Sequence, residues 1–150
     1  MNLPTRIFIA AAAIVLVGSI VLLRMHQSSG PSVAEQRAAQ RAGCGQTERL
    51  FRTHHSNVWV TASAMVSRLL ADQQGRYRHQ RFIVSCSGGQ TILIVNDTSI
   101  GERVPERVGD TVALRGQYVW SGQGGLIHFT HHDPQGSEGG WILDRGHVYR

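Results

Sequence analysis

The sequence contains no lysine, and all 15 of its basic side chains other than histidine are arginines. A planar guanidinium suits paired hydrogen bonds to phosphate or carboxylate, but the same bias is expected from a GC-rich genome. Residues 1–43 carry a net charge of +3, and residues 44–150 carry eleven arginines against nine carboxylates, a net charge of +2. This balance excludes a uniformly basic nucleic-acid binder, so any anion site must be a local cluster.

Other familiar signatures are also missing. No HExxH or CxxC spacing marks a metal site, and the sequence has no internal repeat. Cysteine occurs only at positions 44 and 86. Neither cysteine closely follows the N-terminal apolar run, which argues against a lipoprotein.

The longest apolar run is Ile7–Leu23, 17 residues without a charge. As a helix it would span roughly 26 Å, slightly less than the ~30 Å hydrocarbon core of a bilayer. No small-x-small cleavage site follows it, which favours an uncleaved signal-anchor over a cleaved signal peptide. Residues 1–27 are therefore predicted to be a transmembrane segment in the inner membrane, with the remaining chain in the periplasm; a secreted protein is the alternative.

Residues 28–56 are predicted to be a linker and a helical stalk. Ser32 and Glu35 have the spacing of a capping box, which predicts a helix over Ala34–Ala42 that ends at Gly43. The alanines and glutamines of this helix present no wide apolar stripe, which is why a stalk is expected rather than a packed helix.

From residue 57 the hydrophobic period changes to two, which is typical of strands. The alternation slips at Arg68–Leu70, as expected where a long strand bends through a bulge. Five strands are predicted, at 58–66, 78–86, 90–95, 111–120 and 126–130, followed by a hairpin of 141–144 with 147–150. The predicted fold class is all-β: a five-stranded OB-type barrel over residues 57–150 with a C-terminal β-hairpin, preceded by the transmembrane helix and the stalk. A small open sandwich is the competing architecture.

Barrel topology predicts which distant segments share an end. In an OB barrel the fourth strand runs antiparallel to the first and the fifth runs parallel to the third. The end at which the first strand finishes, here named the far pole, should then collect the chain's unusual polar segments: Arg76–Arg81, Asn96–Thr98, Asp110 and His131–Asp133. At the opposite end Cys44 and Cys86 could meet in a disulfide, which would indicate an oxidising compartment; two unrelated thiols are the alternative.

Five segments resemble a family of small bacterial proteins of unknown function, which are typically exported single-domain proteins. The resemblance runs from Val58 to Tyr149. Its segments are RHQRFIV at 78–84, GQT at 89–91, the Gly-Asp pair at 109–110, GGLIHFTHHDP at 124–134 and GGWI at 139–142. The resemblance implies an OB-like barrel and no stated activity.

The first functional hypothesis is a binding module for a polyanion, either nucleic acid or an oligosaccharide. Arginines interleaved with Tyr77 and Phe82 lie where OB folds often hold such ligands. The candidate ligand-binding residues are Arg76, Arg78, His79, Arg81, Asn96, Asp97, His131, His132 and Asp133.

The alternative is a metal-assisted phosphodiester hydrolase that uses the same residues. His79 and His131 would act as acid and base, and Arg81, or alternatively Arg78, would stabilise developing charge. A divalent metal such as zinc would be held by His79, His131, His132 and Asp133. Neighbouring strand residues point to opposite faces, so His131 and His132 converge only if the chain bends after them. A third, structural hypothesis makes Asp133 the acceptor of an Asx turn that fastens the terminal hairpin.

Overall fold

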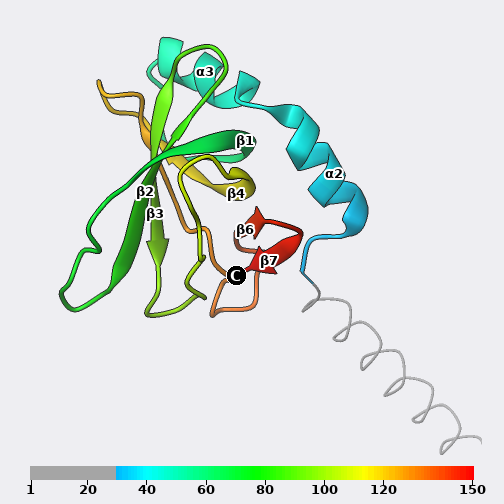
Figure 1. Ribbon diagram of the computed structural model, residues 1–150, viewed down its shortest axis with the longest axis vertical. Helices are drawn as coiled ribbons and strands as arrows, with labels where there is room; N and C mark the ends of the chain where they lie inside the picture. Colours follow the sequence, from blue (N-terminus) through cyan, green and yellow to red (C-terminus); the bar gives the residue numbers. More distant parts are fainter. Residues whose placement is uncertain (1–29) are drawn as a thin grey trace, which may run out of the picture.

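A closed barrel of five strands forms the body of the molecule in the computed structural model, which describes residues 30–150 (Figure 1). The sheet order is β1-β2-β3-β5-β4, and pairing of β4 with β1 closes it. This closure rules out the open sandwich. The strands are β1 (Val58–Leu69), β2 (His79–Ser85), β3 (Thr91–Asp97), β4 (Thr111–Val119) and β5 (Leu126–His128).

The pairing directions agree with those expected from the sequence. The β4 strand is antiparallel to β1, and β5 is parallel to β3. The register between β1 and β2 shifts between Val66 and Arg68, close to the predicted bulge. Two further strands, β6 (Trp141–Asp144) and β7 (His147–Tyr149), form the predicted hairpin, and β6 also pairs with β4.

Alternation of burial along β2 and β3 shows that the core lies inside the barrel. Every second residue of β2 and β3 is buried, and the row ends on each strand with a polar residue, Gln80 and Asn96. The apolar interior consists mainly of Val60, Ala62, Val66, Phe82, Val84, Ile92, Ile94, Val112, Leu114, Tyr118, Ile127 and Ile142.

The predicted fold class needs correcting at its N-terminal end. Within residues 30–150 no helix is long and apolar enough to cross a membrane, and residues 1–27, to which the transmembrane prediction refers, lie outside the described residues. The predicted stalk is also wrong. Helix α2 (Val33–Ala42) has the expected capping box, but it packs against β1 and β4. Small side chains allow this close approach, because Ala39 is buried against Ala113 and its neighbours.

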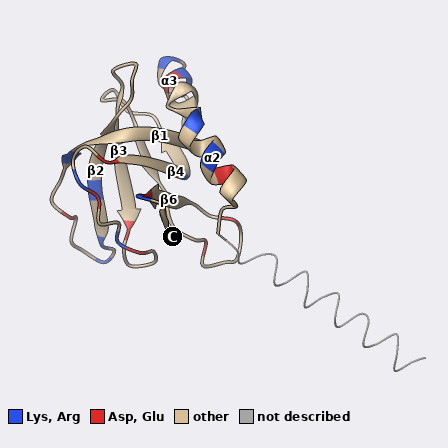
Figure 2. Cartoon of the chain, turned by 45° about the vertical axis from the view of Figure 1, so that its right-hand side comes forward, with Lys and Arg blue, Asp and Glu red and all other residues tan. Residues whose placement is uncertain are grey.

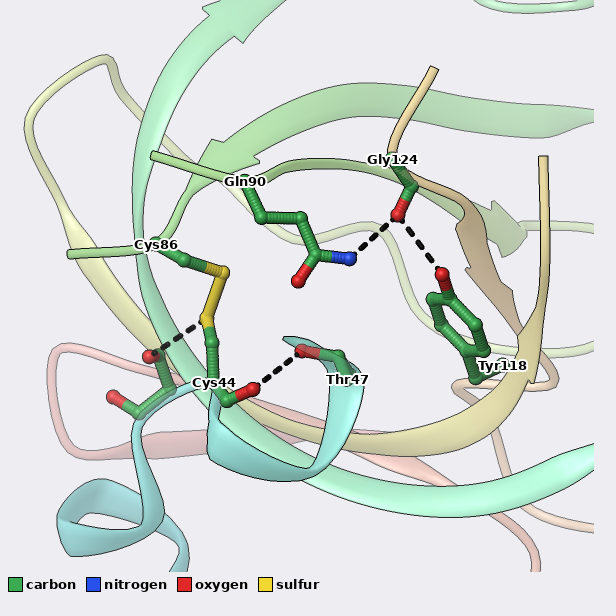
Figure 3. Close-up of a disulfide and its surroundings, with 7 residues drawn as sticks. Cys44, Thr47, Cys86, Gln90, Tyr118 and Gly124 are labelled. Atoms are coloured by element: carbon green, nitrogen blue, oxygen red, sulfur yellow. Dashed lines mark hydrogen bonds between the residues drawn. A yellow bond between two sulfur atoms is a disulfide. The ribbon is translucent and has the colours of Figure 1, made fainter. Parts of the chain in front are cut away.

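A second helix, α3 (Gly45–Arg52), was not predicted, and a disulfide fastens it to the barrel (Figure 3). Cys44 at the start of α3 is bonded to Cys86, directly after β2, which confirms the predicted pairing. Beside the bridge, Gln90 and Tyr118 both donate to the carbonyl oxygen of Gly124. The disulfide therefore fixes α3 at the end of the barrel opposite the far pole.

Candidate functional site

A buried network of polar side chains closes the far pole, the lower end of the barrel in Figure 1. Asn96 donates to Gln80 Oε1 at 3.2 Å and to the Glu102 carbonyl at 2.9 Å, and Thr130 Oγ1 donates to Asn96 Oδ1 at 3.0 Å. Gln80 in turn donates to the Val104 carbonyl at 2.6 Å. Because Asn96 is buried and its polar atoms are paired, its role is to fasten β3 to the segments that follow β3 and β5.

The three predicted arginines differ in what they contact. Arg81 donates from Nε and Nη2 to the Ala71 carbonyl, at 3.1 and 2.9 Å, and so holds the β1–β2 connection. The Arg76 guanidinium lies 5.5 Å from the centroid of the Tyr77 ring. The Arg78 side chain has no hydrogen bond or ion pair within residues 30–150, although its backbone is bonded to Ser99 and Thr98.

Arg78 lines a hollow at the far pole, here named the arginine hollow, of about 330 Å³. Its other lining residues are Asp72, Gln74, Thr98 and Arg103. Arg103 forms a two-point ion pair with Asp72, at 2.6 and 3.4 Å. This pair neutralises the carboxylate, so Arg78 supplies the hollow's uncompensated positive charge.

The structure does not assemble the predicted metal site. His79 Nε2 lies 3.8 Å from Asp97 Oδ2, while His79 Nδ1 is buried without a partner among residues 30–150. Across that same range, no group of three or more His, Cys, Asp or Glu side chains is placed to hold an ion. His131 instead bonds through Nδ1 to the His132 carbonyl at 2.7 Å, which occupies one of its two nitrogens.

Asp133 has the local role that the structural hypothesis assigned to it. Its carboxylate accepts from the Gln135 backbone N–H at 2.9 Å and from the Ser137 hydroxyl. The Ser137 hydrogen bond and then the Gln135 backbone bond hold the pKa of the Asp133 carboxyl below its usual value. These bonds form an Asx turn, which shapes the chain after His132.

Beneath this turn lies a second hollow, here named the aromatic groove, of about 390 Å³. Three large apolar side chains from three separate elements line it. They are Trp59 of β1, Ile100 of the β3–β4 connection and Phe129 after β5, and they are 39%, 37% and 46% exposed. The other lining residues are His131, Asp133, Pro134, Gln135, Ser137 and Gly139.

Both aromatic rings of the groove are held from one side. The Arg115 guanidinium lies 5.0 Å from the centroid of the Trp59 ring, and it also bonds to Glu138 and to the Gly139 carbonyl. Phe129 stacks on His128 with ring centroids 4.0 Å apart. These contacts fix the orientation of two half-exposed rings, as expected of a platform on which a ligand stacks.

The backbone of Phe129 is in the left-handed region, with φ of 53°. That conformation is rare for a bulky residue and costs on the order of 1–3 kcal/mol. The loop that returns from Phe129 is held tightly, because Gly140 donates to the His131 carbonyl at 2.7 Å and a Cβ at Gly140 would overlap the carbonyl oxygens of Phe129 and Arg115. The surroundings therefore impose the strained conformation that exposes the ring.

His128 connects the groove to the sheet. Its Nε2 lies 3.2 Å from Gln117 Oε1, and the strand register places Trp59 opposite Gln117 and Gln117 opposite His128. Burial lowers the pKa of His128, and the nearby His131 and His79 lower it further.

The predicted site residues thus divide between two hollows and the fold itself. Arg78 lines the arginine hollow, His131 and Asp133 line the aromatic groove, and Arg81 and Asn96 hold the chain. The groove residues Trp59, Ile100 and Phe129 were not predicted. The sequence did indicate that Trp59 is exposed, because strand alternation places this large aromatic side chain on the outward face.

The chain belongs to a family of proteins of unknown function, DUF3465, whose model matches residues 32–150. The match includes both helices as well as the barrel. Neither the curated proteins nor the solved structures contain a match to the chain.

Proposed function

We propose that the barrel is of the OB type and serves as a binding module for a polyanionic ligand, which it contacts at the arginine hollow. One observation carries this proposal: Arg78 lines a hollow, and its side chain has no hydrogen bond or ion pair within residues 30–150. A guanidinium presents N–H groups in a fork that matches two oxygens of a phosphate, sulfate or carboxylate.

The surroundings of Arg78 favour an anion there. The Asp72 carboxylate is already paired with Arg103, which leaves the hollow with a net positive charge. The Thr98 side chain lines the same hollow, and Arg76 precedes Arg78 by two residues. Figure 2 shows basic residues on β2 and the segments near it. Because these side chains are exposed, affinity should fall steeply with salt.

The disulfide supports a place for the domain in an oxidising compartment. Such bonds persist in secreted and periplasmic proteins and are rare where thiols are kept reduced. We therefore propose that the ligand is met outside the cytoplasm, as nucleic acid or as an acidic oligosaccharide.

The hydrolase alternative gains no support from the geometry. Of the two arginines considered for stabilising developing charge, Arg81 is bonded through Nε and Nη2 to the Ala71 carbonyl. The hydrolase alternative also required His79 and His131 to share an ion, and within residues 30–150 no third ligand accompanies any such pair.

Fluorescence anisotropy with labelled polyanions tests the proposal. The probes are a single-stranded oligonucleotide and a sulfated oligosaccharide, each titrated at low and at high salt. We expect Arg78→Ala to weaken binding about tenfold or more, the loss of one charge-assisted contact. Arg52→Ala is the matched control, since Arg52 is an exposed arginine on α3. Equal loss in both variants, or no binding by the wild type, would refute the proposal.

A further inference from the structure

We infer that the aromatic groove is a second binding site, separate from the arginine hollow, and that it takes the neutral sugar rings of an oligosaccharide. The site is built from Trp59, Phe129, His131 and Asp133. Its shape, its hydrogen-bonding character and its strained backbone each point to this ligand.

The shape suits flat apolar faces. Trp59 and Phe129 each have one face covered, by Arg115 and His128 respectively, and each is more than a third exposed. Ile100 adds to the apolar lining of the same groove. The axial C–H face of a pyranose is apolar, and it buries well against aromatic rings held at a fixed orientation.

Two polar residues of the groove, His131 and Asp133, offer hydrogen-bond acceptors. The Nδ1 atom of His131 lies 2.7 Å from a carbonyl oxygen, so it must carry the proton in the neutral ring and leave the lone pair on Nε2. That Nε2 has no hydrogen-bond partner within residues 30–150. It is not fully buried, so it keeps access to solvent. Each oxygen of the Asp133 carboxylate already accepts one bond, from Gln135 or from Ser137, and has a second lone pair for a ligand.

These acceptors select the class of ligand. Sugar hydroxyls donate hydrogen bonds and would satisfy His131 Nε2 and the Asp133 carboxylate. A phosphodiester offers no donors, and Asp133 would repel its charge. Arg115, whose guanidinium lies over the Trp59 ring, is paired with Glu138 at 3.0 Å and does not offset this repulsion. The groove is therefore suited to neutral hydroxyl-rich rings and unsuited to a phosphate backbone.

The strain at Phe129 supports a functional reason for exposing its ring. A bulky residue in the left-handed region persists only where its surroundings impose it, and such positions cluster at binding sites. Two glycines let the loop after Phe129 return close to the strand. Gly139 has φ of +63°, and Gly140 lies against the carbonyl oxygens of Phe129 and Arg115. Burial of Phe129 in the core would have avoided both the strain and the exposure.

A panel of neutral linear oligosaccharides tests the inference by isothermal titration calorimetry. The panel contains oligomers of glucose, N-acetylglucosamine, galactose and mannose. At least one should bind, and Trp59→Ala and Phe129→Asn should each weaken that binding about tenfold or more. Asparagine is chosen because it tolerates a positive φ without presenting a ring. Circular dichroism of both variants confirms that the barrel is folded.

Two control variants separate this inference from the proposed function. Tyr77→Ala removes another exposed aromatic, outside the groove, and Arg78→Ala empties the arginine hollow of its charge. Neither should change binding of a neutral oligosaccharide. The inference is overturned if no member of the panel binds, if Trp59→Ala has no effect, or if Trp59→Ala weakens binding of a single-stranded oligonucleotide instead.

Discussion

Removal of the Cys44–Cys86 disulfide should cost this protein a large part of its stability. The bridge closes a loop with a sequence separation of 42 residues, which contains α3, β1 and β2. In the chain-entropy model a loop of this length restricts the unfolded chain by about 4 kcal/mol at 25 °C. Small domains are stable by only about 5–15 kcal/mol, so the predicted loss is a large fraction of the total.

The folded state adds a smaller cost. Both cysteines are buried, with 5% and 6% of their surfaces exposed. The double substitution Cys44→Ala and Cys86→Ala therefore removes buried atoms as well as the bond. We therefore expect the double variant to lose at least about 4 kcal/mol, of which the larger share comes from freeing the unfolded chain. The helices should be affected first, because the bridge is the covalent link between α3 and β2.

Equilibrium urea unfolding measures this effect. The midpoint of the double variant should fall, and its slope with denaturant should rise, because an unbridged chain exposes more surface on unfolding. Wild-type protein in excess reductant should shift toward the variant. A loss below about 1 kcal/mol would refute the reasoning, since it would mean that the unfolded chain is already restricted between the two positions.

Three further predictions concern single residues. Folding lowers the pKa of His128. The neutral side chain therefore contributes stability above about pH 6.5, and this contribution is lost as the pH falls through the folded pKa. The variant His128→Gln should show a smaller fall of the melting temperature in acid. Burial raises the pKa of Glu106 above 4.5, so ionisation opposes folding as the pH rises through the folded pKa. Glu106→Gln should therefore raise the melting temperature at neutral pH, with the difference closing in acid. Gly140→Ala should destabilise by about 2 kcal/mol or more in urea unfolding, because the new methyl group overlaps two carbonyl oxygens. Gly136→Ala, which also has positive φ but open space around it, should cost only about 1 kcal/mol.

The barrel could be predicted from the sequence because its strands have one buried face. Alternation is strict along residues 58–66 and along His79–Ser85, and the core requires it. Helix α3 could not be predicted in the same way. It is short and has no side-chain N-cap bond, and the disulfide holds its first turn against the barrel. The packing of α2 against the barrel could not be predicted for another reason. Its alanines and glutamines form no apolar stripe in the sequence.

The role of Asn96 was misjudged. In the structure it continues the inward row of Ile92 and Ile94, whereas the sequence run Ile92–Val95 is apolar on both faces and does not show which face is inward. A buried asparagine needs partners, and Gln80 on the neighbouring strand occupies the matching inward position. Arg81 is different: its bonds to Ala71 depend on how the β1–β2 connection folds back, which no local pattern shows.

The aromatic groove depends on pairings between distant strands. Trp59 and Phe129 are brought to one side because β1 pairs with β4 and β4 with β5, in a register that aligns Trp59, Gln117 and His128. The backbone of Phe129 then turns its ring outward, and its φ is imposed by the loop rather than by its own preference. A sequence can suggest that Trp59 is exposed, but it cannot show what faces it.

The turn after β3 lies between the two hollows and contributes to both. Thr98 lines the arginine hollow and Ile100 lines the aromatic groove, while bonds to Asp97 from Ser99 and Gly101 hold the turn between them. One acidic oligosaccharide could therefore place an anionic group beside Arg78 and a neutral ring between Trp59 and Phe129.

Occupation of both hollows by one ligand makes a quantitative prediction. The second contact becomes intramolecular once the first has formed, so an acidic oligosaccharide long enough to cross the turn should bind more tightly than a short one. Arg78→Ala and Trp59→Ala should each reduce the long ligand to the affinity of a single site, and the double variant should lose binding altogether. The alternative is that the losses of binding free energy in Arg78→Ala and Trp59→Ala sum to the loss in the double variant for every length of ligand. In that case the two hollows bind separate molecules.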